Sequence, residues 1–371
     1  MKILLYSPYL FPLHFGGGER YILDCACLAR DAGYEVFLAA PAKLLEKNQL
    51  SLLAPYEKFL NRSLEGIHLV AAPFFEQTSF VKKLIWTKQW EEIYYLTDGS
   101  FFFSLAQRNI LHIQFPLPIA KKSFLQNWKL ANWQVKNTNS FFTKQYVEKN
   151  WQTKVQFVHQ PYVDQNEFAV SAAIKKQKQI LHVGRFFSQL HSKRQDVLIE
   201  AFRLLIKKEP ELLKDWRLSF VGSVEDQEYF QSLQEKAAGL PIDFFTDLPR
   251  QELIKKYQTA SIYWHATGYG VNQDEHPEMM EHFGISVLEA MAAGAVPLVI
   301  RRGGLPEVLG EKLDDCLWDD LTTCQEKTLE LLRNPEELTA KAKLAKERSQ
   351  YFSQERFRQT LMEMIGAKKH V

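Results

Sequence analysis

Two glutamates eight residues apart, Glu281 and Glu289, form the most informative pattern in the chain. The sequence between them, His-Phe-Gly-Ile-Ser-Val-Leu, predicts a loop that leads into a helix beginning near Phe283 or Gly284. Gly294 is expected to end that helix before a buried strand. Free N–H groups at such a helix start carry partial positive charge and favour an anion, while carboxylates beside them accept hydrogen bonds from hydroxyl groups. The pattern therefore predicts a pocket for a phosphorylated sugar.

A second pair of candidate groups is cationic. Arg185 follows a predicted buried strand, in Val-Gly-Arg-Phe-Phe, and Lys193 stands just before the next predicted helix, in His-Ser-Lys-Arg-Gln-Asp. Cations at these two places can converge on one anion. The next residue, Arg194, is the alternative to Lys193. The spacing therefore predicts a binding site for one anion.

Three consecutive glycines, Gly16, Gly17 and Gly18, lie between a predicted strand and a predicted helix near the start of the chain. Glycines allow positive φ and let the backbone approach a ligand closely, and the helix start adds N–H donors. The run is not the Gly-x-Gly-x-x-Gly dinucleotide fingerprint, because residue 21 is Tyr. We therefore do not expect a nicotinamide-dependent dehydrogenase. A loop that only turns the chain stays open as an alternative.

Histidines form the remaining set of candidates. His112 is expected near the end of a strand, where its ring could hydrogen-bond a reacting sugar or an acceptor, although a structural histidine fits equally well. His265, His276 and His282 lack the spacing of metal ligands, and the chain has no Asp-x-Asp triplet. We interpret His276 and Glu278 as loop anchors. We expect phosphate to be held by helix ends and cations without a metal ion.

These motifs, in this order, resemble those of family 4 glycosyltransferases. The stretch Glu-His-Phe-Gly-Ile-Ser-Val-Leu-Glu, followed by Ala-Met-Ala-Ala-Gly and Val-Pro-Leu-Val, looks like the donor-site signature of that family. Its spelling is close to the α-1,2-mannosyltransferases of the dolichol pathway and to bacterial enzymes of polysaccharide assembly. The resemblance implies an α/β fold of the GT-B type, in which two Rossmann-like domains face each other across a cleft. It also implies transfer of a hexose with retained anomeric configuration.

The resemblance further implies a role for each residue of the donor signature. Glu289 is expected to hydrogen-bond the nucleotide ribose, and Glu281 is expected to hold hexose hydroxyls. The N–H groups of Phe283, Gly284 and Ile285 are expected to lie on the hexose or the phosphate. The nucleotide sugar is a co-substrate, and no other cofactor is implied.

Outside the signature, the resemblance places Arg185 and Lys193 on the donor diphosphate. It places His112 near the hexose ring, and it implies that the glycine loop 16–18 closes over the phosphates. Relatives commonly have the lysine nearer to the arginine, which is why Arg194 is kept as an alternative.

The elements that must position these residues follow an α/β rhythm. In the first half, strands are expected at 3–6, 34–40, 68–71, 93–96, 110–113 and 155–158, with a helix over 20–32 that Gly33 ends. In the second half, strands are expected at 179–184, 216–221, 242–245, 260–265 and 296–300. Strands and helices in alternation with short links imply parallel sheets with right-handed crossovers.

The irregular tract 162–179 is the best candidate for an interdomain linker. We therefore predict an N-terminal acceptor-side domain over residues 1–165 and a C-terminal donor domain over 172–350. The final helical segment, 352–371, is expected to return to the first domain, as in GT-B enzymes.

Composition excludes several classes of protein. The net charge of only +2 argues against a nucleic-acid partner, although residues 1–165 carry 18 Lys and Arg against 13 Asp and Glu. Cys25, Cys27, Cys316 and Cys324 do not form a disulfide framework in a chain of 371 residues, so we expect reduced thiols and a cytoplasmic protein. The apolar run at the N-terminus is too short for an export signal, and no window is long enough to span a membrane.

Two tracts in the first half, 82–86 and 121–125, combine lysines with large apolar residues. Such tracts are typical of surfaces that rest on lipid, so peripheral contact with the inner face of a membrane is one interpretation. A buried helix face with solvated lysines is the other.

The donor and the acceptor are left open by the sequence. The spelling of the signature favours GDP-mannose, with UDP-glucose next, and the acceptor is expected to be a hydroxyl of a glycan, a lipid-linked sugar or a small molecule. Two alternatives to a transferase stay open. One is a sugar-nucleotide epimerase or phosphorylase on the same fold, and the other is a non-catalytic protein that binds sugar nucleotides.

Overall fold

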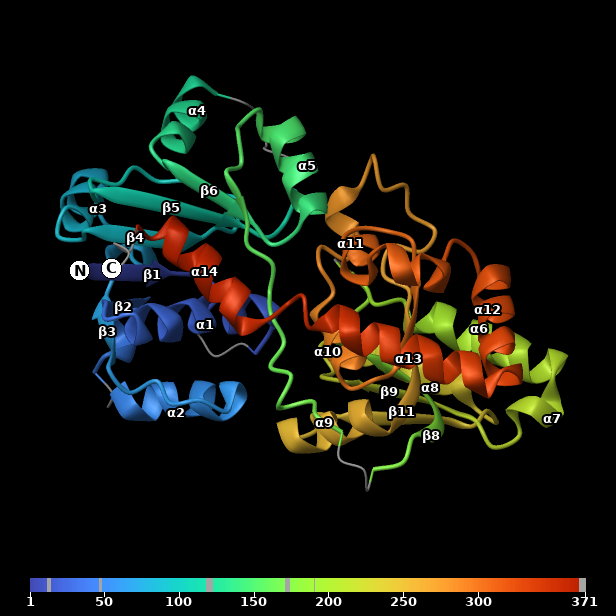
Figure 1. Cartoon of the computed structure of the whole chain (residues 1–371). Coiled ribbons are helices and arrows are strands. Elements are labelled where there is room, and N and C mark those ends of the chain that lie inside the picture. Colours follow the sequence, from blue (N-terminus) through green and yellow to red (C-terminus); the bar gives the residue numbers. More distant parts are fainter. Residues whose placement is uncertain (12–14, 47–48, 118–122, 171–173, 190, 367–371) are drawn as a thin grey trace. The chain divides into compact units, whose positions relative to one another are not determined.

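A computed structural model describes residues 1–11, 15–46, 49–117, 123–170, 174–189 and 191–366 of the protein (Figure 1). The chain divides into two compact units. The N-terminal unit comprises Met1–Pro161 and Glu355–Val371, and the C-terminal unit comprises Tyr162–Gln354. The first division thus falls a few residues before the predicted boundary at 165, because Val163 and Phe168 are buried in the core of the C-terminal unit.

The N-terminal unit is built on a seven-stranded sheet in the order β3-β2-β1-β4-β5-β6-β7, and every strand pair is parallel. The strands are β1 Lys2–Tyr6, β2 Glu35–Ala40, β3 Ile67–Ala71, β4 Glu92–Leu96, β5 Arg108–Ile113, β6 Val135–Thr138 and β7 Phe157–Val158. Its helices are α1 Gly17–Asp31, α2 Gln49–Leu60, α3 Phe80–Thr87, α4 Phe124–Ala131, α5 Phe141–Trp151 and α14 Gln354–Met364. Figure 1 shows α1 and α2 on the opposite side of this sheet from α4. Strands β1, β2 and β4 are mostly apolar and buried, as expected for a sheet covered on both faces, whereas β6 buries the polar run 136–138.

The C-terminal unit is built on a six-stranded parallel sheet in the order β10-β9-β8-β11-β12-β13. The strands are β8 Gln177–Val183, β9 Arg217–Gly222, β10 Ile242–Thr246, β11 Ala260–His265, β12 Val296–Ile300 and β13 Leu317–Trp318. The helices are α6 Gln195–Lys208, α7 Pro210–Leu213, α8 Gln227–Ala237, α9 Arg250–Thr259, α10 Ile285–Ala292, α11 Leu305–Leu309, α12 Leu321–Arg333 and α13 Pro335–Ser349. Because β8 and β11 are neighbours, the loops that follow them lie at the same edge of the sheet.

The last helix, α14, belongs to the N-terminal unit although its sequence follows the C-terminal one. The backbone carbonyls at its end accept hydrogen bonds from Arg108 (2.7 Å to the Met364 oxygen) and from Tyr34 (2.8 Å to the Ile365 oxygen). The end of α14 is therefore tied to residues beside the N-terminal sheet. Within the predicted segment 352–371, residues 367–371 lie outside the described part of the chain.

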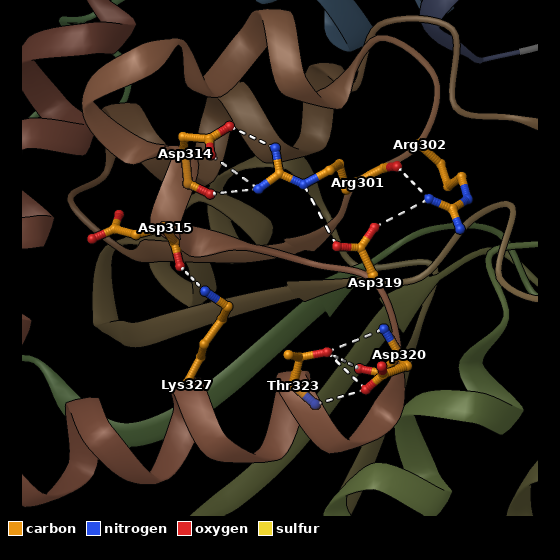
Figure 2. Close-up of polar contacts among 8 residues, drawn as sticks. All are labelled: Arg301, Arg302, Asp314, Asp315, Asp319, Asp320, Thr323 and Lys327. Atoms are coloured by element: carbon orange, nitrogen blue, oxygen red, sulfur yellow. Dashed lines mark hydrogen bonds and ion pairs between the residues drawn. The ribbon is translucent and has the colours of Figure 1, made fainter.

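An ion-pair network holds the segment that follows β12 (Figure 2). Arg301 donates to both carboxylate oxygens of Asp314, at 2.6 and 3.0 Å, and its Nε lies 3.6 Å from Asp319. Arg302 contacts Asp319 at 3.3 Å, and Asp320 caps the start of α12. These bonds anchor the chain immediately before Gly303 and Gly304, which pack against the loop that carries Glu281.

Candidate functional site

An ion pair between Lys193 and Glu281 forms the centre of the candidate site. Lys193 lies in the loop before α6, and its Nζ donates to Oε2 of Glu281, in the loop before α10, at 2.5 Å. The same carboxylate oxygen lies 3.0 Å from Nε2 of His265, the last residue of β11. The structure thus brings together two residues predicted from sequence and adds a third, His265, whose ring is fully buried.

The protonation states in this trio follow from its surroundings. Burial favours a neutral carboxyl, but the Lys193 ammonium and the hydrogen bond from His265 hold the pKa of Glu281 well below its usual range. Burial lowers the pKa of His265, although the Glu281 carboxylate partly offsets that effect. His265 is therefore a neutral ring whose Nε2–H donates to Glu281, while its Nδ1 accepts from the N–H of Thr267 at 3.4 Å. The trio presents one cation and one carboxylate, both partly accessible.

A second buried histidine, His182 of β8, lies beside the trio. Its ring centre is 5.7 Å from that of His265, and its Nδ1 lies 2.8 Å from the carbonyl of Trp264, which requires Nδ1 to carry the proton. Its Nε2 has no hydrogen-bond partner among the described residues. Burial lowers the pKa of His182 to about 3. This Nε2 is therefore a free acceptor. It lies close to Gly184, where an added Cβ would come within 3.2 Å of it.

The loop that carries Glu281 packs closely against the backbone of two glycines, Gly303 and Gly304. The N–H of Gly304 donates to the Glu281 carbonyl at 2.7 Å. A Cβ on Gly303 would lie 2.0 Å from that carbonyl oxygen, and one on Gly304 would lie 2.4 Å from the carbonyl oxygen of His282. No side chain fits at either position, so the loop can be held in this place only by glycines.

The helix after this loop begins slightly later than predicted. Gly284 is the N-cap residue of α10 with φ of +104°, and Ile285 is the first helical residue. A positive φ explains the need for glycine at this point. Within the described part of the chain, the N–H groups of Phe283, Gly284 and Ile285 donate to no hydrogen-bond acceptor. The start of α10 is therefore an open set of donors a few residues from Glu281.

Glu289 lies on the second turn of α10 in a different ion-pair cluster. Arg250, at the start of α9, donates to Glu289 at 2.9 Å and to both oxygens of Glu167 at 2.8 and 2.9 Å. Burial opposes the charge on Arg250, but the two carboxylates more than offset burial and raise the pKa of the guanidinium. Glu289 is only 7 % exposed, so its carboxylate is held in a fixed position by Arg250.

The other predicted cations differ in how firmly they are held. Arg185 is half-exposed and pairs with the exposed Glu225 at 2.8 Å. Arg194, the alternative to Lys193, contacts Asp196 at 3.1 Å and the carbonyl of Tyr269. Because Arg194 already bridges two elements while Lys193 reaches Glu281, the geometry favours Lys193 as the cation of the site.

In the N-terminal unit, His112 lies in the core. It is the last but one residue of β5, its ring stacks on that of Tyr21 at 3.9 Å, and it has no exposed surface. Its Nδ1 donates to Oδ1 of Asn137 at 2.5 Å, and burial lowers the pKa of the ring to about 3. Its Nε2 has no partner among the described residues. His112 is thus a neutral ring with a bare acceptor, as His182 is in the other unit.

The glycine loop is ordered differently from the prediction. None of Gly16, Gly17 and Gly18 has positive φ, because helix α1 begins at Gly17 rather than near residue 20. An added Cβ at position 18 would lie 2.7 Å from the side-chain amide of Gln114, so that side chain would have to move to make room for it. The N–H of Gly16 donates to Glu19 at 3.0 Å, which closes the first turn. The three glycines therefore do not use the positive φ that glycine allows.

Sequence reasoning missed His265, His182 and Arg250 as parts of the site. His265 had been weighed only as a metal ligand, although its place at the end of a strand was a usable signal. His182 and Arg250 had no local signal, since their importance depends on which strands and helices are neighbours. The linker residues 171–173, and residues 121–122 of the second lysine-containing tract, lie outside the described part of the chain.

The chain has two parallel Rossmann-like sheets. Hydrogen-bond donors, cations and carboxylates lie in the loops after the strands of the second sheet, and this combination defines a class of protein. Residues 163–348 match the sequence profile of the family described as "Glycosyl transferases group 1". The chain belongs to this family, and its fold is of the GT-B type.

The chain shares sequence similarity with curated glycosyltransferases. The chain is similar to the GDP-Man:Man(3)GlcNAc(2)-PP-Dol alpha-1,2-mannosyltransferase of Kluyveromyces lactis, with 25% identity over 185 residues, which is 46% of this chain and 30% of that protein. The sulfoquinovosyl transferase SQD2 of Arabidopsis thaliana is 26% identical over 132 residues, which is 36% of this chain and 21% of that protein. The chain thus matches less than a third of the length of these curated relatives.

Solved structures resemble the chain over nearly its whole length. HepE of Anabaena, in complex with UDP and glucose, has a TM-score of 0.72 with 16% identity and covers 99% of this chain and 100% of that one. Sucrose-phosphate synthase from Thermosynechococcus elongatus also has a TM-score of 0.72, with 15% identity, covering 99% of this chain and 98% of that one. At this identity the likeness establishes the fold.

Proposed function

We propose that this protein is a retaining glycosyltransferase of family 4, which transfers a hexose from a nucleoside diphosphate sugar to a hydroxyl acceptor. The observation that carries the proposal is the Lys193–Glu281–His265 trio beside the open N-terminus of α10. A cation, a fixed carboxylate and free N–H groups are the groups needed to hold a phosphate and sugar hydroxyls together.

We propose that Lys193 and Glu281 exchange each other for new partners when the donor binds. In the structure, the charge of Lys193 is neutralised by Glu281. A bound diphosphate offers Lys193 a new anionic partner, and hexose hydroxyls offer Glu281 new donors to replace the ammonium. His265 keeps its hydrogen bond to Glu281 throughout and so holds the carboxylate in place. The N–H groups of Phe283, Gly284 and Ile285 then donate to the hexose or the phosphate.

The remaining donor contacts follow from the second ion-pair cluster. Glu289, fixed by Arg250, accepts hydrogen bonds from the nucleotide ribose in this proposal. Arg185 takes the diphosphate with Lys193, which requires it to leave the exposed Glu225. Exposed ion pairs are worth about 1 kcal/mol or less, so this exchange is inexpensive.

The chemistry proposed is substitution at the anomeric carbon. The bond from that carbon to the phosphate oxygen breaks, and the bond to the acceptor oxygen forms on the same face of the ring. The acceptor's proton leaves with the diphosphate. Lys193 and Arg185 stabilise the negative charge that grows on the departing phosphate, and no metal ion is required in this scheme.

Contacts from the N-terminal unit complete the proposal. His112 is assigned to the donor hexose through Nε2, the atom that lacks a partner among the described residues, and because this ring has no exposed surface the contact requires the side chains that cover it to move. The loop of Gly16, Gly17 and Gly18 is assigned to the phosphates, with the small residue at position 18 leaving room against Gln114.

The donor that we propose first is GDP-mannose, and UDP-glucose is second. The first choice is supported by the Glu-His-Phe-Gly-Ile spelling and by similarity to a GDP-mannose-dependent enzyme, and the second by the fold shared with a UDP- and glucose-bound protein. The acceptor proposed is a hydroxyl of a glycan, a lipid-linked sugar or a small molecule. The place proposed is the cytoplasm, with the N-terminal unit in peripheral contact with the inner face of a membrane.

The proposal can be tested with a panel of nucleotide sugars. We expect GDP-mannose or UDP-glucose to raise the melting temperature of the protein, and slow hydrolysis of the stabilising donor to release free hexose and nucleoside diphosphate. An isomerised nucleotide sugar would indicate an epimerase, and a sugar phosphate would indicate a phosphorylase. Stabilisation without turnover in the presence of glycan acceptors would indicate a binding protein. No stabilisation by any nucleotide sugar would overturn the proposal.

A further inference from the structure

Large apolar side chains are exposed together on two short helices of the N-terminal unit, α3 and α4. We call this region the α3–α4 surface. It consists of Phe80, Val81 and Ile85 of α3, Leu105, and Phe124, Leu125 and Trp128 of α4, each between 49% and 87% exposed. In a helix on the surface of a water-soluble domain, the outward positions are normally polar. Here they are aromatic and aliphatic, so the lysine-bearing tract at 82–86 does not lie on a wholly buried face.

The α3–α4 surface is continuous across the two helices. The ring of Phe103, in the loop after β4, lies 6.0 Å from Phe80 of α3 and 4.8 Å from Trp128 of α4, with both pairs edge to face. The helices are anchored from beneath by Thr87 and Leu130, which are buried. The exposed side chains therefore project from a packed base and form a single apolar area. Contiguous apolar areas of this kind mark sites of interaction.

Positive charge accompanies the apolar residues. Lys82, Lys83 and Lys88 lie on or just after α3, and Lys129 lies on α4. The segments 77–90, 99–107 and 123–134 contain no Asp or Glu. None of the four lysines forms an ion pair with another described residue. The cationic groups thus lack counterions in the described part of the protein, and their charge is available to an anionic partner.

We propose that the α3–α4 surface docks the N-terminal unit onto a bilayer that contains anionic lipid. Phenylalanine, tryptophan and leucine insert at the boundary between headgroups and acyl chains, while neighbouring lysines extend to lipid phosphates. A protein partner would not require the combination of unpaired lysines and side chains as exposed as Phe124, at 87%. No helix of the described residues is both long enough and apolar enough to pass through a membrane. Docking from one side is therefore the mode that this surface offers.

The inference extends the membrane contact in the proposed function, and it gives that contact a location and a lipid class. A surface that holds the N-terminal unit on the bilayer would present the enzyme to acceptors that are themselves attached to lipid. Acceptors dissolved in water would gain nothing from it. The surface thus favours a lipid-linked acceptor among the three kinds proposed.

The test measures co-sedimentation of the full chain with vesicles. We expect binding to vesicles of phosphatidylcholine mixed with phosphatidylglycerol and much weaker binding to phosphatidylcholine alone. Ile85→Ser combined with Phe124→Ser should abolish binding, and neither side chain forms a ring contact or hydrogen bond with the described residues. Lys82→Glu combined with Lys83→Glu should weaken binding by at least roughly 25-fold, since each lysine near an anionic surface contributes about fivefold and the introduced carboxylates add repulsion.

Two matched variants serve as controls. Leu204→Ser removes an exposed aliphatic side chain from α6 of the other unit, and Lys343→Glu reverses an exposed charge on α13. Both should bind vesicles as the unaltered protein does. Melting of each variant with the stabilising nucleotide sugar separates this inference from the proposed function, because donor binding should survive in all of them. Vesicle binding that none of the α3–α4 variants changes would overturn the inference. So would α3–α4-dependent self-association in light scattering without vesicle binding, which would assign the surface to a second copy of the chain.

Discussion

The two units bury histidines in contrasting surroundings. In the C-terminal unit, His265 donates to an ionised carboxylate that is also paired with a lysine. In the N-terminal unit, His112 and His159 lie among neutral partners. Tyr21 hydrogen-bonds to Nδ1 of His159, and Nε2 of His159 donates to the carbonyl of Phe357 at 2.9 Å. His265 therefore supports a charged site, whereas His159 joins the last helix to the sheet.

The contrast shows how burial and function can be told apart. An ion pair such as Lys193–Glu281 is costly to desolvate and can exchange its partners for those of a ligand. The tyrosine and histidine network of the N-terminal unit consists of neutral groups with committed donors, so a ligand gains little by displacing them. Within that network, the bare Nε2 of His112 is the exception.

The largest effect is expected at the Lys193–Glu281 pair. Lys193→Ala and Glu281→Ala should each abolish glycosyl transfer, with a loss in kcat of at least about 10²-fold, because each removes a group that stabilises the reacting donor. Steady-state kinetics with the stabilising donor would measure the loss. Lys207→Ala, at an exposed position on α6, is the matched control and should leave kcat unchanged.

Circular dichroism should show that both site variants are folded. Loss of one partner leaves the other charge partly buried, so melting temperatures should fall in both. If either variant keeps near-native turnover, the role assigned to that residue is wrong.

The next effect is expected at Arg250, which neutralises two carboxylates at once. Arg250→Ala should lower the free energy of unfolding by about 3–5 kcal/mol, since Glu167 and Glu289 would then repel each other in a buried place. Arg250→Lys should recover only part of this, because lysine cannot donate to both carboxylates in the planar geometry of a guanidinium. Chemical denaturation measures the stability, and calorimetry with a nucleoside diphosphate measures ribose binding. Unchanged nucleoside affinity in Arg250→Ala would contradict the assignment of Glu289 to the ribose.

The fold could be predicted in outline because strand and helix periodicities are local. The parallel sheets follow from that alternation, and Gly33 ends α1 with φ of +87° as expected. The site was harder to predict because it depends on strand order. Lys193 and Glu281 are 88 residues apart, and they meet because β8 and β11 pair. That adjacency is not encoded in a local pattern, which is why His265 was not recognised as a partner of Glu281. The role of Gly18 was likewise hidden, since the side chain that it accommodates, Gln114, comes from another strand end.

The N-terminal histidines provide a paired test of the comparison. His112→Ala should reduce transfer by roughly 10-fold or more if its Nε2 contacts the donor, while His159→Gln should leave turnover per folded molecule unchanged. Kinetics normalised to the folded fraction would distinguish the two. Equal loss of turnover in both variants would show that His112 acts only through the packing of the unit.

The contribution of His159 to the stability of the protein should depend on pH. Burial lowers the pKa of His159 in the folded protein to about 3, below the ordinary value of 6.5. Between these two pH values the ring stays neutral in the folded protein but gains a proton in the unfolded chain. Stability from this group is thus complete above pH 6.5 and is lost as pH falls toward 3, by about 1.4 kcal/mol per pH unit. The stability deficit of His159→Gln should therefore shrink below pH 6.5 in denaturation curves. A deficit that is constant with pH would show that His159 titrates normally.

At His265 an indirect effect is expected, because this residue acts through Glu281. His265→Phe removes a hydrogen bond to a charged group, which is worth about 1.5–3 kcal/mol, so transfer should fall roughly 10- to 100-fold. His265→Gln, whose amide N–H can still donate, should recover much of this. The informative measurement is the pH profile of kcat/KM. Glu281 must be ionised to accept from hexose hydroxyls, and its pKa is held low by Lys193 and by His265. Loss of the His265 donor raises that pKa, so the acid limb of the profile should move to higher pH in His265→Phe and stay near its original place in His265→Gln. A reduced rate with an unshifted acid limb would mean that His265 only fills space, and the charged and neutral histidine environments of the two units would then not differ in function.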